Sequence, residues 1–92
     1  MIRKQIQSIN TALKIYYEYP EIGNKEITAL FGNMSSSTMT QMKRAAKERM
    51  IENDIKSYVP NTVNTEIAFK VWGIDIEDLE KRRNKIIKLG LV

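Results

Sequence analysis

Seven polar side chains between residues 36 and 47 have the types and spacing that nucleic-acid binding requires. Small hydroxyls come first, and a glutamine and three basic side chains follow. Hydroxyls at the start of a helix bind phosphates together with the free backbone amides there, whereas Gln and Arg form paired hydrogen bonds with the edges of adenine and guanine. Lysines neutralise phosphates, and we expect Arg49 to assist them. The seven residues are Ser36, Ser37, Thr40, Gln41, Lys43, Arg44 and Lys47.

The apolar residues of the same stretch predict the helix that presents these side chains. Met39, Met42, Ala46 and Met50 fall on one face at helical spacing, and residues 36–52 contain neither Gly nor Pro. With those four residues toward the core, the seven polar residues lie on or beside the opposite face. Ser35 is the expected N-cap. Residues 36–50 carry four basic side chains and one acidic one, so positive charge is concentrated on this helix.

A short helix and a sharp turn are predicted to come before this helix. Ile27, Leu30 and Phe31 form one apolar face over about residues 25–31. Asn24 can accept hydrogen bonds from the free amides at the start of that helix. The next two residues, Gly and Asn at positions 32 and 33, are the types that best tolerate a left-handed backbone. The sequence therefore predicts a helix, a tight turn and a longer helix in succession.

The stretch EITALFGNMSSSTMTQMKRA resembles the helix-turn-helix of DNA-binding proteins. Ala29 stands where that family needs a small residue between two helices, and Asn33 falls in the turn four residues later. The chain differs from the family pattern at Asn33, where Gly is usual, and at Thr28, where an apolar residue is usual. The family's buried positions after the turn are matched by Met34, Met39 and Met42.

This resemblance implies sequence-dependent binding of double-stranded DNA, with the helix over residues 36–52 in the major groove. It also implies a use in transcription regulation and homodimers on two half-sites, as in small regulators encoded by bacteria, phages and mobile elements. Activation and repression stay equally open. A function of another class also stays open: a protein-interaction module, such as a small adaptor or inhibitor, that keeps the helical layout and does not bind nucleic acid.

The rest of the chain predicts three further helices. Apolar residues recur every three or four positions over about residues 3–18, which indicates an amphipathic helix. Residues 54–64 are expected to form a polar linker with an extended segment at 55–59. Thr65 or Asn64 then caps a short helix that Gly73 ends. Asp75 caps a last helix that ends at Gly90. The apolar stripe of the first helix is Ile2, Ile6, Ile9, Leu13 and Tyr16.

No alternating pair of strands is visible, so the expected fold is all-α with about five helices. The length of 92 residues fits a single domain, residues 1–92. Within it we expect a helix-turn-helix core at 1–53, the linker at 54–64 and a C-terminal helical pair at 65–92.

The C-terminal pair has large apolar side chains that suit a dimerisation surface or the chain's own core, and the sequence does not decide between the two. Acidic residues between 75 and 80 would be repelled by phosphates, so this pair is not expected to enter a groove. The residues proposed for dimerisation are Phe69, Trp72, Leu79 and Ile86.

Composition narrows the possible chemistry. The chain has no Cys and no His, which excludes disulfides, thiolate or imidazole metal sites and nucleophiles that need a histidine. We expect no enzyme activity, no catalytic residue, no metal, no cofactor and no small-molecule ligand. The apolar runs are too short for a membrane span, so a cytoplasmic protein is expected. A net charge of +4 is compatible with a polyanionic partner.

Overall fold

Five helices and one pair of short strands make up the part of the chain that the computed structural model describes, residues 6–90. The mainly helical class predicted from the sequence is confirmed, whereas the prediction that no strands pair is wrong. The elements are α1 (Ile9–Glu18), β1 (Glu21–Ile22), α2 (Asn24–Phe31), α3 (Ser36–Glu52), β2 (Val63–Asn64), α4 (Thr65–Val71) and α5 (Ile76–Lys88).

Helix α1 begins at Ile9, six residues later than the pattern of apolar residues predicted. The Ser8 hydroxyl caps the helix by accepting a hydrogen bond from the Thr11 amide at 3.3 Å. Just before the cap, the Gln7 amide donates to the Leu30 carbonyl at 2.9 Å and so ties this segment to the end of α2. The Gln7 amide is therefore hydrogen-bonded to another helix, whereas a longer α1 would need this amide for a bond within α1. Residues 1–5, including the predicted stripe residue Ile2, lie outside the described part.

The two strands join segments that are distant in the sequence. β1 and β2 are antiparallel, with Glu21 opposite Asn64 and Ile22 opposite Val63. Ile22 and Val63 are fully buried, so the pairing places both side chains in the core. The predicted linker at 54–64 thus contains a strand at its end, outside the extended segment expected at 55–59.

In the turn between α2 and α3, the glycine and not the asparagine has the left-handed backbone conformation. Gly32 has a φ of 87°, whereas Asn33 does not have a positive φ. A Cβ atom on Gly32 would also collide with the Gln7 side chain. At the other end of α2, Gly23 is the N-cap and its amide donates to Glu26 Oε1 at 2.8 Å. The prediction of Asn24 as the cap is therefore wrong by one residue.

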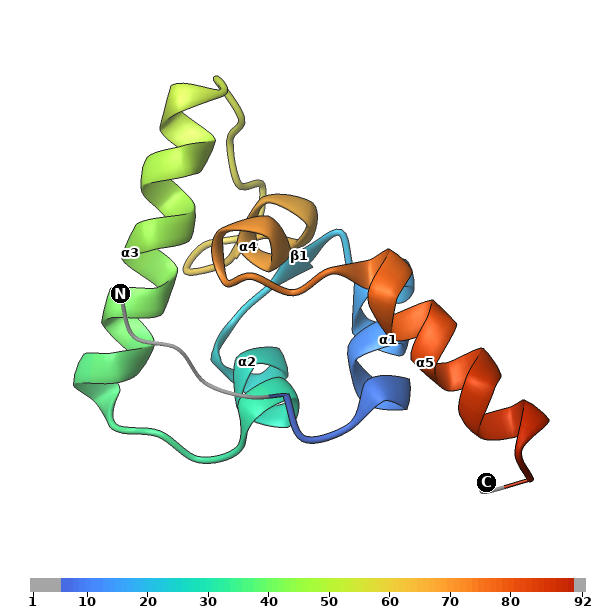
Figure 1. The fold of residues 1–92 in the computed structure, drawn as a ribbon. Helices are drawn as coiled ribbons and strands as arrows, with labels where there is room; N and C mark the ends of the chain where they lie inside the picture. The colour runs from blue at the N-terminus through green and yellow to red at the C-terminus, as the bar shows by residue number, and fades with distance from the viewer. Residues whose placement is uncertain (1–5, 91–92) are drawn as a thin grey trace.

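Helix α4 lies between α3 on one side and α1 and α5 on the other (Figure 1). Its Phe69 ring is 5.3 Å from the ring of Tyr16 in α1. The ring of Trp72, the C-cap residue of α4, is 5.8 Å from the ring of Phe31 in α2, and the indole Nε1 donates to the Met42 carbonyl of α3 at 3.0 Å. These contacts make α4 the centre of the hydrophobic core.

Candidate nucleic-acid interface

Helix α3 has the bounds and the buried face that the sequence predicts. Its first residue follows Ser35, whose Oγ accepts the Thr38 amide at 3.1 Å as the expected N-cap. The helix runs for 17 residues and ends at Glu52. The buried residues of α3 are Met39, Met42, Ala46 and Met50.

The polar side chains expected to bind DNA lie away from that buried face. Lys43 is half-buried at the edge of the face, and the other six residues are exposed. All seven therefore belong to one continuous surface, which we call the α3 face. Its residues are Ser36, Ser37, Thr40, Gln41, Lys43, Arg44 and Lys47.

Lys43 connects the α3 face to the start of α2. Its Nζ donates to Asn24 Oδ1 at 3.0 Å. Burial lowers the pKa of the Lys43 ammonium, and the positive charge of Lys47 lowers it further. The role of Asn24 is thus to place Lys43 beside the first turn of α2, which the sequence did not indicate.

Two residues that the sequence analysis did not assign to the site also lie on this side of α3. Glu48 and Ile51 line a shallow groove of about 370 Å³ together with four residues of the α3 face. Ile51 is 77% exposed. Helical spacing from Arg44 could have identified both, because they follow it by four and seven residues. The shared groove is lined by Thr40, Lys43, Arg44, Lys47, Glu48 and Ile51.

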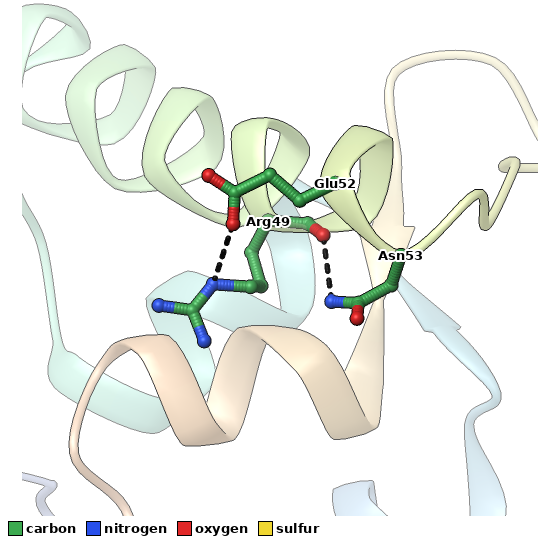
Figure 2. A network of polar contacts seen from close by, with 3 residues as sticks. All are labelled: Arg49, Glu52 and Asn53. Carbon is green, nitrogen blue, oxygen red and sulfur yellow. Dashed lines mark hydrogen bonds and ion pairs between the residues drawn. The ribbon is translucent and has the colours of Figure 1, made fainter.

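Arg49 points away from the α3 face. Figure 2 shows its Nε paired with Glu52 Oε2 at 3.3 Å, while the Asn53 side-chain amide donates to the Arg49 carbonyl at 2.8 Å. Both side chains of the ion pair are exposed, so the pair contributes little to stability. Because residues two apart on a helix point in nearly opposite directions, Arg49 lies on another side than Lys47. The expectation that Arg49 contacts phosphates together with the lysines is therefore not supported.

The helix-turn-helix resemblance agrees with part of this geometry. Met34 is half-buried, and Met39 and Met42 are buried as the resemblance implies. Ala29, however, is exposed. Helix α2 packs mainly on α1 and β1, whereas α3 packs mainly on α4 and β2. No close approach of α2 and α3 thus requires a small residue at position 29.

Three of the four residues assigned to dimerisation are occupied by the chain's own core. Phe69 is 1% exposed, Leu79 5% and Trp72 9%, while Ile86 is half-buried. The first three side chains belong to the hydrophobic core of the chain and are not available on the surface. The interface residues therefore need revision, and dimerisation itself stays a prediction.

Among residues 6–90, no helix combines the length and apolar composition that a membrane span requires. Within the same residues, no group of three or more acidic side chains is placed to hold a metal ion. No family model, curated protein or solved structure matches the chain.

Proposed function

We propose that the chain binds double-stranded DNA in a sequence-dependent way through the α3 face, and that it acts in transcription regulation. The observation that carries this proposal is the division of α3 into two sides. Four apolar side chains anchor one side in the core, and hydroxyl, amide and basic side chains are exposed on the other. Such a surface offers phosphate contacts and base-specific hydrogen bonds from one rigid element.

The first three turns of α3 are the part that suits a groove. A helix of 17 residues is about 25 Å long, whereas the major groove is only about 12 Å wide. Past Lys47 the exposed side carries the Glu48 carboxylate, which phosphates would repel, and the apolar Ile51. DNA contact is therefore centred on residues 36–47.

Within that segment the residues have different roles. Gln41 and Arg44 are long, exposed and nearly one turn apart, so they contact base edges. Lys47 and the half-buried Lys43 contact phosphates. The hydroxyls of Ser36, Ser37 and Thr40 lie at the start of α3, where free backbone amides also bind phosphate.

A salt titration tests this function. Fluorescence anisotropy of a labelled duplex of mixed sequence, titrated with the full chain, measures affinity at several salt concentrations. Each neutralised phosphate contributes about −0.9 to the slope of log affinity against log salt, so the two lysines that contact phosphates predict a slope of roughly −2 for each chain. Absence of binding at low salt, or binding that does not change with salt, would contradict the proposal.

The exposed Ile51 beside Glu48 favours a second candidate function, a protein-interaction module. An apolar side chain next to a carboxylate suits a protein partner better than a phosphate backbone. In that case the labelled duplex would not bind at any salt concentration. The same titration therefore separates the two functions.

We also propose that the chain acts as a homodimer on two half-sites, because one reading helix seldom supplies enough specific affinity. Sedimentation equilibrium of the full chain, free and with duplex, measures this. Exposed apolar residues remain at the end of α5, at Ile87 and at the C-cap Leu89, next to the half-buried Ile86. A chain that stays monomeric at high concentration in both states would contradict the dimer.

A further inference from the structure

A cleft of about 680 Å³ opens between the end of α1, the start of α4 and the first turns of α5. Its volume lies within the range of about 300–1,000 Å³ that is usual for small-molecule sites. None of the residues of the α3 face lines it. The lining residues are Tyr16, Tyr17, Tyr19, Pro20, Asn64, Thr65, Glu66, Ile76, Glu77 and Glu80.

Tyrosine rings form part of the wall of this cleft. The rings of Tyr16 and Tyr17 meet edge to face, with an interplanar angle of 87° and centroids 5.2 Å apart. The Tyr16 hydroxyl donates to Glu66 Oε1 at 3.4 Å, and the Tyr17 hydroxyl donates to Glu80. Tyr19 adds a third ring to the lining.

The charge in the cleft is opposite to that of the whole chain. Three carboxylates line it, and none of its lining residues is a lysine or an arginine, in a chain of net charge +4. Glu66 and Glu80 each accept a hydrogen bond from a tyrosine hydroxyl. Glu77 is exposed and has no hydrogen bond or ion pair within residues 6–90, so its charge is free to attract a ligand.

Both hydroxyls also stay protonated over a wide pH range. Burial is the main cause that raises the pKa of Tyr16, and the nearby Glu66 carboxylate adds to it. The hydrogen bond to Glu80 is the main cause that raises the pKa of Tyr17. The tyrosine rings therefore stay neutral.

We propose that this cleft binds a small organic ammonium ion. Aromatic faces attract a cation through the ring quadrupole, and this mode of recognition is typical of ammonium groups that carry alkyl substituents. The carboxylates supply the balancing charge, and Ile76 and Pro20 contact the alkyl part. This site does not depend on DNA binding, because it shares no residue with the α3 face.

Calorimetric titration of the full chain with choline tests the site. Its matched control is 3,3-dimethylbutan-1-ol, which has the same shape and carries no charge. We expect choline to bind with a dissociation constant on the order of 1 mM and the alcohol not to bind. Equal binding of the two compounds, or no heat of binding with choline up to about 50 mM, would overturn the proposal.

Variants of the cleft separate the contributions of charge and ring. Glu77→Gln should weaken choline binding by about two- to fivefold, whereas Glu48→Gln, the same change on α3, should leave it unaltered. Tyr17→Leu should weaken binding by a similar factor, and Tyr17→Phe, which keeps the ring, should not. Circular dichroism checks the folding of each variant. Equal affinities for Glu77→Gln and wild type would overturn the proposal even if the tyrosine variants fail to fold.

Two probes of equal charge decide the source of the ammonium group. Spermidine is a small triamine, and a capped trilysine peptide presents the same charge on a polypeptide. We expect spermidine to bind at least as tightly as the peptide. Tighter binding of the peptide would make the occupant a basic segment of a partner protein and would refute a small ion.

Discussion

The α3 face and the cleft between α1, α4 and α5 carry opposite charges and are built in different ways. The side chains of the α3 face come from one helix, and its three basic groups lie within about two turns. The cleft combines carboxylates and tyrosines from segments that are distant in the sequence. The net charge of +4 describes neither surface. The comparison shows that the distribution of charge, more than its sum, determines which partners a small chain can bind.

Removal of the side chain that supports α3 should have the largest effect. Trp72→Ala deletes the ring contact with Phe31 and the hydrogen bond to the Met42 carbonyl. We expect the free energy of unfolding to fall by about 3–5 kcal/mol, because a large buried side chain leaves a cavity. Urea denaturation followed by circular dichroism measures the change.

The control for this variant is Tyr58→Ala, since the Tyr58 side chain is 92% exposed. That substitution should change the unfolding free energy by no more than about 0.5 kcal/mol. If Trp72→Ala kept full stability and lost only self-association, Trp72 would instead belong to an interface between chains.

Arg44→Ala should weaken DNA binding by the α3 face. We expect a loss of about 1–3 kcal/mol in binding to a selected cognate duplex and a much smaller loss on random duplex, because Arg44 contacts a base edge. Anisotropy titrations on the two duplexes give both values. Equal losses would make Arg44 a phosphate contact.

Lys47→Gln should weaken binding to every duplex and reduce the salt slope by roughly one unit. Arg49→Gln is the matched control two residues away, and it should leave the slope nearly unchanged because Arg49 pairs with Glu52 on another side of α3. The slope is measured by the salt titration described above. A larger change for Arg49→Gln than for Lys47→Gln would place the DNA on the side of α3 that carries Arg49 and would contradict binding through the α3 face.

Replacing one glutamate by glutamine in each region should change duplex affinity in one region and not in the other. Glu48→Gln removes a negative charge beside Arg44 and should strengthen duplex binding by about two- to threefold. Glu77→Gln makes the same change in the cleft and should leave duplex affinity unaltered. Anisotropy on one duplex compares the two variants, and an equal gain for both would show only a general effect of net charge.

A modest effect on stability is expected at Glu21 in β1. Glu21 Oε1 accepts hydrogen bonds from the Tyr58 amide at 2.9 Å, the Val59 amide at 3.3 Å and the Thr62 hydroxyl at 2.8 Å. Burial alone would raise the pKa of Glu21, but these three bonds outweigh it and lower the pKa.

A lowered pKa in the folded state means that this contribution to stability is present above the ordinary glutamate pKa, about 4.3. It is lost as the pH falls through the folded-state value. Glu21→Gln should therefore cost up to about 1 kcal/mol at pH 7, reduced by solvent screening, and less at low pH. Urea denaturation at both pH values checks this, and a cost that grows on acidification would contradict it.

The sequence predicted α3 well because every signal for it is local. Ser35 caps the helix three residues before the Thr38 amide that it binds, and the methionines recur within four turns. No tertiary contact was needed to place the bounds. The exposed polar side then follows from the buried one.

Features that depend on contacts between distant segments were not predicted. The two-residue strands show no alternation, and their pairing becomes visible only when Ile22 and Val63 meet in the core. Tryptophan is common in protein interfaces as well as in cores, so only the contacts of Trp72 show to which of the two it belongs. The cleft was missed for the same reason, because Tyr17 and Glu80 are far apart in the sequence.

The most direct test of the central claim is an amide chemical-shift map of the full chain titrated with duplex DNA. We expect the largest changes on residues 36–47 and smaller ones at Asn24 and Lys25, near the Lys43 contact. Amides of Glu66 and Glu77 in the cleft should not shift. Changes confined to the cleft, or no changes along α3 at low salt, would contradict DNA binding through α3.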